Sequence, residues 1–247
     1  MRIATYNIWD SDSGMPMRFQ HLIDEIKNVD ADIMCLQEVS DRKKHDDISE
    51  QCGYKYSNWK EQEGISILCK HPIEKSTEVN YGLASLIHVS DLAILAVNVH
   101  LPWDRPSLRE QAIVKIVEYI STIKADYVIL LGDFNCSEKS AVHRFLTNQQ
   151  SLLGEDAYYF DLAEAYTEIN GTRLLATLNF RDNPRWGIVE SKNTIELNQR
   201  FDRILLKNPY PEKLPELKNC DIFGTKISEV TNLAASDHYG LFAEMDF

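Results

Sequence analysis

Residues 127–135 read YVILLGDFN, an apolar run that ends abruptly in polar residues. A continuous apolar stretch such as 127–131 is typical of a strand buried on both faces. Asp133 and Asn135 place two acceptor groups directly after that stretch, on a turn that Gly132 permits. This segment predicts a buried strand that delivers polar side chains to the edge of a sheet, where active sites on sheet scaffolds commonly lie.

The same junction of apolar run and polar residue recurs along the chain. Its other instances are Asn7 after IATY, Glu38 after DIMCLQ, His100 after AILAVNV, Asp202 within RFDRILL, and Asp237 with His238 just before YGLF. One polar residue at a strand end means little, because most such groups are ordinary hydrogen-bonded residues. Six such places, all offering Asn, Asp, Glu or His, predict one shared site.

Oxygen donors dominate this set. They are the amide of Asn7 and the carboxylates of Glu38, Asp133, Asp202 and Asp237. Such donors suit magnesium, manganese or calcium better than zinc. Magnesium also keeps several waters and binds substrate phosphate, which suits phosphoryl chemistry. A carboxylate near His238 can orient the imidazole, although an ordinary buried hydrogen bond is the alternative interpretation.

The composition is that of an ordinary globular protein with an acidic surface. The 247 residues are 44% hydrophobic and 26% charged, with a net charge of −12. Strong non-specific binding to duplex DNA is not expected of such a chain, because it relies on basic surface. Five cysteines without a CxxC pair exclude a zinc knuckle and a disulfide framework. Without a signal-peptide pattern or a bilayer-spanning apolar run, we expect a cytoplasmic protein with no membrane insertion.

Alternating strand and helix patterns predict an α/β or α+β domain. Strands are expected at 2–8, 32–39, 54–59, 64–70, 84–89, 92–99, 127–131, 174–180, 200–206 and 239–245. Helices are expected at 17–28, at 45–52, from a capping box that runs from Ser107 to Glu110, and at 138–148. Three prolines make 207–219 a loop, and 181–198 is a long irregular stretch. Without repeats or linkers, a single domain over 1–247 is expected.

Six short motifs in order carry a family resemblance. TYN-I, LQEV, NVHL, GDFN, RFDRI and SDHYG, spread over residues 5–240, resemble the endonuclease/exonuclease/phosphatase superfamily. The resemblance implies an α/β fold, a four-layer sandwich of two central, mostly antiparallel sheets flanked by helices. RFDRILL, SDHYGL and the histidine at position 100 are most similar to the 5′-tyrosyl-DNA phosphodiesterase group. The chain departs from that group at Cys136-Ser137-Glu138, where an arginine for the phosphate is expected, and at Leu178, where an aromatic residue is expected.

The resemblance also implies a role for each matching residue. Asn7, Glu38 and Asp237 would bind the metal, magnesium or alternatively manganese. Asp133 and Asn135 would orient the attacking water, and His100 would stabilise charge on the phosphate. His238, partnered by Asp202, would contact the scissile phosphate, and Arg109 would support the site. In-line attack of water on phosphorus is the implied reaction.

Three functions remain open from the sequence, each for an expected monomer. The first is a phosphodiesterase acting on a nucleic-acid end or a nucleotide conjugate. A basic wall would then be formed by Arg181, Arg185, Lys192, Arg200 and Arg203, with Trp186 stacking on a base, although a solvated loop explains the same residues. The second is a phosphatase of small molecules such as inositol phosphates. The third is a non-catalytic scaffold, which the presence of all the motif residues disfavours.

Overall fold

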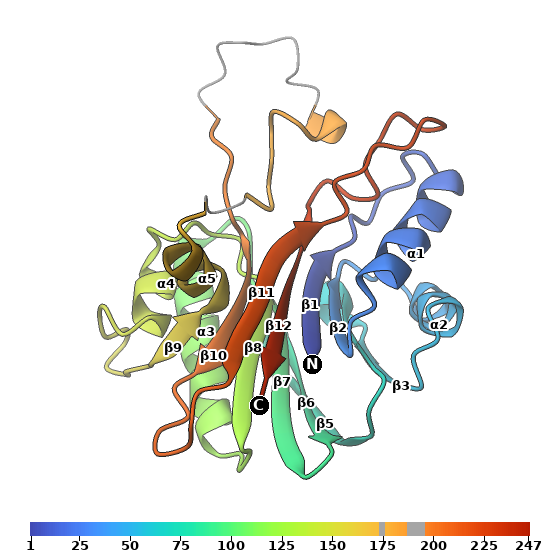
Figure 1. Ribbon diagram of the computed structural model, residues 1–247. Helices are drawn as coiled ribbons and strands as arrows, with labels where there is room; N and C mark the ends of the chain where they lie inside the picture. Colours follow the sequence, from blue (N-terminus) through green and yellow to red (C-terminus); the bar gives the residue numbers. More distant parts are fainter. Residues whose placement is uncertain (173–175, 187–195) are drawn as a thin grey trace.

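The computed structural model describes residues 1–172, 176–186 and 196–247. Figure 1 shows strands at the centre of the molecule with helices on both outer sides. The helices are α1 (Met17–Val29), α2 (Arg42–Gln51), α3 (Pro106–Ser121), α4 (Ala141–Leu146) and α5 (Leu162–Asn170), with short 3-10 turns at Gln62–Gly64 and Pro184–Trp186. Helices α1 and α2 cover one side, and α3, α4 and α5 lie on the other. No helix among the described residues is long and apolar enough to cross a membrane.

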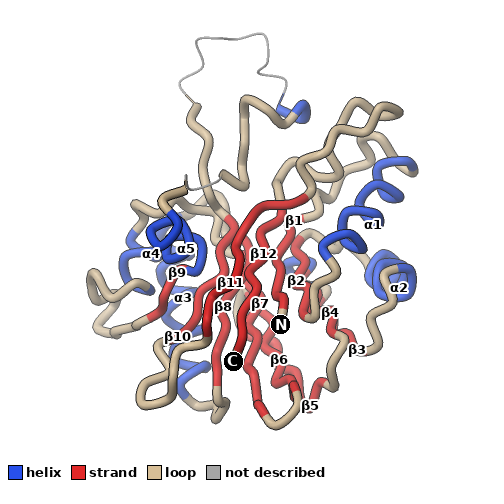
Figure 2. The backbone as a smooth tube through the Cα atoms, in the orientation of Figure 1, coloured by secondary structure: helices blue, strands red, loops and turns tan. Residues whose placement is uncertain are grey.

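Two six-stranded sheets form the centre, as the red strands of Figure 2 show. Sheet A has the order β11 (Glu216–Phe223), β12 (Gly240–Asp246), β1 (Arg2–Asn7), β2 (Ile33–Gln37), β4 (Ile65–Cys69) and β3 (Tyr56–Lys60). Sheet B has the order β5 (Ile73–Val79), β6 (Gly82–Val89), β7 (Leu92–His100), β8 (Tyr127–Asp133), β10 (Asp202–Lys207) and β9 (Tyr159–Asp161). Each sheet contains one parallel pair, β1 with β2 and β7 with β8, and the other pairs are antiparallel. The predicted four-layer, mostly antiparallel sandwich is therefore confirmed.

The alternation of side chains along each central strand explains the layers. In β8, Ile129 and Leu131 join the cluster between the two sheets, whereas Val128 and Leu130 pack beneath α3 and α4. Strand β2 divides in the same way, with Met34 and its neighbours on the outer side beneath α1 and α2. Successive side chains of a strand point to opposite faces, so a strand covered on both faces is apolar throughout.

Strand directions gather the polar junctions at one edge of the sandwich. The parallel pair β7–β8 sets His100 opposite Asp133, and the antiparallel pair β8–β10 sets Asp133 opposite Asp202. Strand β12 runs antiparallel to β1, so the segment before β12 lies beside the end of β1 at Asn7. Residues far apart in the sequence therefore meet where these strands end or begin.

Gly132 lies within strand β8 and not in a turn, which corrects the prediction from the sequence. Its φ is +134°, and a Cβ atom there would lie 2.1 Å from the Val99 carbonyl oxygen of the paired strand. Only glycine tolerates both constraints. Gly132, directly before Asp133, is thus needed for the close approach of β7 to β8.

Other expectations also needed correction. The capping box at Ser107 is wrong: α3 begins at Pro106, and its N-cap residue, Arg105, makes no side-chain cap bond. Proline is favoured at the first helical position, so the helix starts before the serine. The expected strand 174–180 is only a bridge between Leu178 and Gln199, and 174–175 lie outside the described residues. The predicted loop 207–219 ends early, because β11 begins at Glu216.

A buried polar cross-link joins the two sheets near the site. Asn98 of β7 donates from Nδ2 to the carbonyl oxygens of Leu36 (2.9 Å) and Ser66 (2.8 Å) in sheet A. Its Oδ1 accepts from Gln37 Nε2 at 2.6 Å. All three hydrogen bonds are buried. Without Asn98, the two carbonyl oxygens and the Gln37 amide would each lose a partner at a place where no water can replace it.

Replacing Asn98 with leucine should therefore destabilise the fold. We expect Asn98→Leu to lower the free energy of unfolding by about 3 kcal/mol, because two carbonyls and an amide lose partners. The same change at exposed Asn170, whose side chain donates to the Tyr166 carbonyl of its own helix, should alter it by less than about 0.5 kcal/mol. Urea unfolding measures both values, and equal effects would contradict the prediction.

Candidate active site

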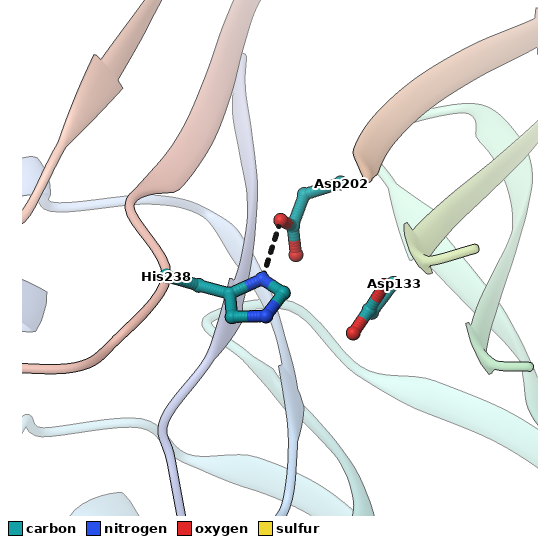
Figure 3. A group of neighbouring side chains, drawn as sticks. All are labelled: Asp133, Asp202 and His238. Carbon is teal, nitrogen blue, oxygen red and sulfur yellow. Dashed lines mark hydrogen bonds and ion pairs between the residues drawn. The ribbon is translucent and has the colours of Figure 1, made fainter. Parts of the chain in front are cut away.

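An ion pair between Asp202 and His238 lies at the centre of the site. Asp202 is fully buried at the start of β10 in sheet B, and His238 is 7% exposed just before β12 in sheet A. His238 Nδ1 lies 2.9 Å from Asp202 Oδ2. Figure 3 shows Asp202 and Asp133 on the same side of the imidazole. The pair therefore bridges the two sheets as well as orienting the ring.

Neighbouring carboxylates keep His238 protonated. Burial alone would lower the pKa of the imidazole, but Asp202, Asp133 and Asp237 together raise it to about 10. Burial also raises the pKa of Asp202, and the imidazolium opposes that rise. Since Nδ1 donates to Asp202, the other ring nitrogen is available to donate to a substrate oxygen.

Asn7 holds two carboxylates together across the sheets. Its Nδ2 donates to Glu38 Oε1 at 3.0 Å and to Asp133 Oδ2 at 3.1 Å. Its Oδ1 accepts from the Trp9 backbone N–H, and the second oxygen of Glu38 accepts from the Asp10 backbone N–H. Asn7 thus presents its amide nitrogen, and not its oxygen, to the carboxylates that could hold a cation.

Asn135 and His100 complete the group around Asp133. Asn135 adopts a left-handed φ of 49°, and its backbone N–H donates to Asp133 Oδ1 at 2.8 Å. Its side-chain amide donates to the Leu101 carbonyl at 2.9 Å. His100 donates from Nδ1 to the Glu63 carbonyl at 3.1 Å, which leaves Nε2 3.9 Å from Asp133 Oδ2.

The charge balance of this edge fits a divalent cation. Asp10 pairs with Lys44 and Glu63 pairs with Lys60, but no lysine or arginine among the described residues forms an ion pair with Glu38, Asp133 or Asp237. Burial raises the pKa of Asp237, and nearby Glu38 and Asp133 raise it further, although His238 and Arg185 oppose the rise. One oxygen of Asp202 is also buried without a partner. Glu38, Asp133 and Asp237 therefore offer oxygen ligands and negative charge that no lysine or arginine of the described residues balances. Magnesium prefers such oxygen ligands.

Two grooves of about 500 Å³ each meet at the site and share Trp103, Asn135 and His238. The acidic groove is also lined by Asp10, Glu38, Ser40, Glu61, Glu63, Gly64, His100 and Asp133. The tryptophan groove is also lined by Arg109, Cys136, Ser137, Ser140, Leu178, Trp186, Gln199 and Phe201. The carboxylates therefore line one of the two grooves that meet at His238, and the other is lined by aromatic, apolar and polar side chains with a single arginine.

Arg109 and Trp186 both line the tryptophan groove, but each is already held in place. Arg109 donates from one nitrogen to the carbonyls of Pro102 and Trp103, both at 2.8 Å. Trp186 donates from Nε1 to the Asp237 carbonyl at 3.1 Å, and its ring packs edge-to-face on Phe180. Arg109 thus supports a loop of the site, and Trp186 forms a fixed side of the groove.

The basic wall expected from the sequence is not formed as predicted. Arg200 and Arg203 are buried, and Lys192 lies outside the described residues. Arg203 donates to the Cys136 carbonyl, and Arg185 stacks over Trp9 and Trp186. Buried guanidinium groups cannot meet a nucleic-acid backbone, so only the outer arginines of this set remain at the surface.

Arg200 instead organises a network that the sequence did not reveal. It forms ion pairs with Glu138 (3.2 Å), Asp161 (2.8 Å) and Glu164 (3.1 Å), and His143 lies 3.1 Å from Glu164. His143, Asp161 and Glu164 also have the geometry of a metal group. The guanidinium already supplies the positive charge there, so this cluster anchors β10 two residues before Asp202.

Two hydroxyl groups that the sequence analysis did not assign hold the motif residues in place. Thr177 Oγ1 accepts from the backbone N–H groups of Phe201 (3.1 Å) and Asp202 (3.2 Å). Ser236 Oγ donates to the Asn7 carbonyl at 2.6 Å and accepts from the His238 N–H at 3.3 Å. Ser236 lies inside the SDHYG motif, which was the available signal for it.

Comparison with curated proteins finds distant relatives. Protein angel homolog 2 from Bos taurus and its Homo sapiens counterpart are each 25% identical over 165 residues, which cover 52% of this chain and 30% of theirs. The match therefore spans less than a third of those proteins.

Solved structures match over the whole chain. Truncated Caenorhabditis elegans TDP2 has a TM-score of 0.76 at 20% identity and covers 100% of this chain and 97% of its own. D. rerio TDP2 complexed with single strand DNA product has a TM-score of 0.79 at 16% identity, with 100% and 99% covered. At these identities the likeness establishes the fold, which is shared with the TDP2 structures.

The family itself is established by a sequence profile. The profile of the Endonuclease/Exonuclease/phosphatase family matches residues 4–238. That range includes every site residue from Asn7 to His238 and all the strands of the two sheets except β12 and the first residues of β1. With the sandwich and the converging strand ends already described, this match shows that the chain belongs to the Endonuclease/Exonuclease/phosphatase family.

Proposed function

We propose that this protein is a magnesium-dependent phosphodiesterase that acts on a nucleic-acid end or a nucleotide conjugate. The observation that carries the proposal is the buried Asp202–His238 pair next to Glu38, Asp133 and Asp237, with which no lysine or arginine of the described residues forms an ion pair. Membership of a family of phosphoester hydrolases supports the reaction class. The single-strand DNA product in the D. rerio TDP2 structure supports the substrate class.

The residues divide into those that would hold the metal and those that would act on phosphate and water. Glu38 and Asp237 would bind magnesium, with Asn7 fixing the rotamer of Glu38. Bound magnesium would neutralise charge on the phosphoryl oxygens. Manganese offers a similar preference for oxygen ligands.

The remaining groups would act on the attacking water and on the phosphate. Asp133 is a fully oriented carboxylate that can accept the proton of an attacking water, and the Asn135 amide beside it can position that water. Protonated His238 can donate to a phosphoryl oxygen, and His100 Nε2 faces the same space. Charge that develops in the transition state would meet donors fixed in advance, which is the largest source of such catalysis.

The proposal is tested by direct comparison of substrates. A 5′-phosphotyrosyl oligonucleotide and an inositol polyphosphate should be assayed with magnesium and with a chelator. We expect magnesium-dependent hydrolysis of the oligonucleotide, absent with His238→Ala. Hydrolysis of the inositol polyphosphate alone would replace the phosphodiesterase proposal with the small-molecule phosphatase.

Removing the charge of Glu38 should weaken magnesium binding. Glu38→Gln keeps the shape of the side chain, so we expect the magnesium concentration for half-maximal activity to rise about tenfold or more. The exposed Glu118→Gln on α3 provides a control with the same change in net charge, and its magnesium response should not shift. Titration of activity against magnesium gives both values, and identical curves would exclude Glu38 from metal binding.

Asp202 should determine the pH range of activity. The raised pKa of His238 keeps the imidazole protonated as pH increases, so the wild-type rate should persist well above about pH 6.5, the ordinary imidazole pKa. A bound cation would offset the charges of Asp133 and Asp237, which leaves Asp202 as the main carboxylate that raises the pKa of His238. In Asp202→Asn we expect a rate loss on the order of a hundredfold and a fall in activity from about pH 6.5 upward. An unchanged pH–rate profile, alongside the exposed control Asp91→Asn, would rule out this role.

A further inference from the structure

Trp103 is an exposed aromatic side chain at the point where both grooves meet. Its side chain is 80% exposed, yet it borders the acidic groove and the tryptophan groove. Exposing an indole to water is unfavourable, and large aromatic residues at a groove are typical of ligand contact. No aromatic contact or hydrogen bond of the indole is recorded among the described residues.

The backbone beneath Trp103 is held in a fixed position. Arg109, one turn inside α3, donates to the carbonyls of Pro102 and Trp103 at 2.8 Å each. The guanidinium is thereby committed to the loop between β7 and α3. Arg109 is a positioning residue for Trp103, so the indole is presented over the groove without the backbone having to order on binding.

The other side of the tryptophan groove is apolar and equally fixed. Trp186 is held by its bond to the Asp237 carbonyl, by Phe180 and by the Arg185 guanidinium 5.3 Å from its ring centroid. Leu178 is 5% exposed beside it. A flat group in this groove would lie between an available indole and a rigid apolar surface.

The charges of the tryptophan groove exclude a polyphosphate. Arg109 is the sole lysine or arginine among the described residues that line it, and that arginine is bound to carbonyls. Ser137 stands close to Asn135 in this groove and brings no charge. Several phosphates would therefore remain unneutralised, whereas a neutral planar ring would be desolvated at little cost.

From these observations we infer that the tryptophan groove binds a planar aromatic ring attached to the reacting phosphate, stacked on Trp103. This inference rests on the proposed function, in which the phosphate lies at His238, and it specifies the substrate class. The ring is either a nucleobase or the phenol of a tyrosyl ester, since both share the chemistry that stacks on an indole. An inositol ring, which is saturated and multiply charged when phosphorylated, does not fit.

Binding of phosphonates tests the inference without any turnover. Methylphosphonate, phenylphosphonate and the 5′-methylenephosphonate of thymidine carry the same anionic head and no ester bond to hydrolyse. In ligand-observed NMR titrations with magnesium, we expect a ring-bearing compound to bind about tenfold more tightly than methylphosphonate. A gain for thymidine alone identifies a nucleobase site, and a gain for both identifies a general ring site.

Variants of Trp103 test whether its indole causes the preference for a ring. Trp103→Ala should abolish the preference for a ring, and Trp103→Phe should retain part of it. Tyr210→Ala, at an aromatic residue that is 86% exposed outside the residues lining either groove, should retain all of it. Equal binding of the three phosphonates to the wild type, or an unchanged preference in Trp103→Ala, would overturn the inference. If the protein prefers ring-bearing phosphonates but hydrolyses no phosphoester, the proposed function is wrong and the inference about the tryptophan groove stands.

Discussion

The ion pair between Asp202 and His238 is the constraint on which the site depends. It joins a strand of sheet B to the segment that leads into β12 of sheet A, so the sheets cannot shift at this edge without separating opposite charges. A buried pair gains little net stability, because both partners lose their water. Its value lies in geometry: it fixes one imidazole nitrogen and leaves the other directed toward the space that Asp133 also faces.

The placement of positive charge explains why the remaining carboxylates form no ion pair with an arginine or lysine of the described residues. The chain buries Arg200 and Arg203 close to the site, yet Arg200 is surrounded by carboxylates and Arg203 donates to a backbone carbonyl. Neither can neutralise Glu38, Asp133 or Asp237. Had either guanidinium reached this edge, it would have compensated the charge that a cation is needed to balance. The fold therefore uses its arginines to hold β10 rigid and leaves the catalytic edge electronegative.

The parts of the fold that could be predicted from the sequence are those with a repeating pattern of apolar and polar residues. The strands and their convergence were predictable, because each apolar run is long enough for a strand and ends in a polar residue: Asn7, Glu38, His100 or Asp133. The capping box at Ser107 failed because proline at position 106 starts the helix first. Strand β11 was missed because an edge strand of alternating charged residues lacks an apolar pattern. The Arg200 network was not predictable, since its members come from three separate stretches of the sequence, 138–143, 161–164 and position 200, and no local pattern shows that they are buried.

The two grooves suggest how one arrangement of strand ends can serve a particular substrate. The proposed catalytic groups lie in strands of the sandwich or directly beside strand ends, whereas Trp103 and Trp186 lie in the connections between strands and helices. Loops can change without disturbing the ion pair or the carboxylates. Here, Arg109 holds the Trp103 loop through backbone carbonyls, so the bond does not depend on the side chain at position 103. Trp186, in contrast, is held through its own indole N–H, which donates to the Asp237 carbonyl. Position 103 can therefore change its side chain while its backbone stays fixed, which is what the proposed recognition of a ring beside an in-line phosphate requires.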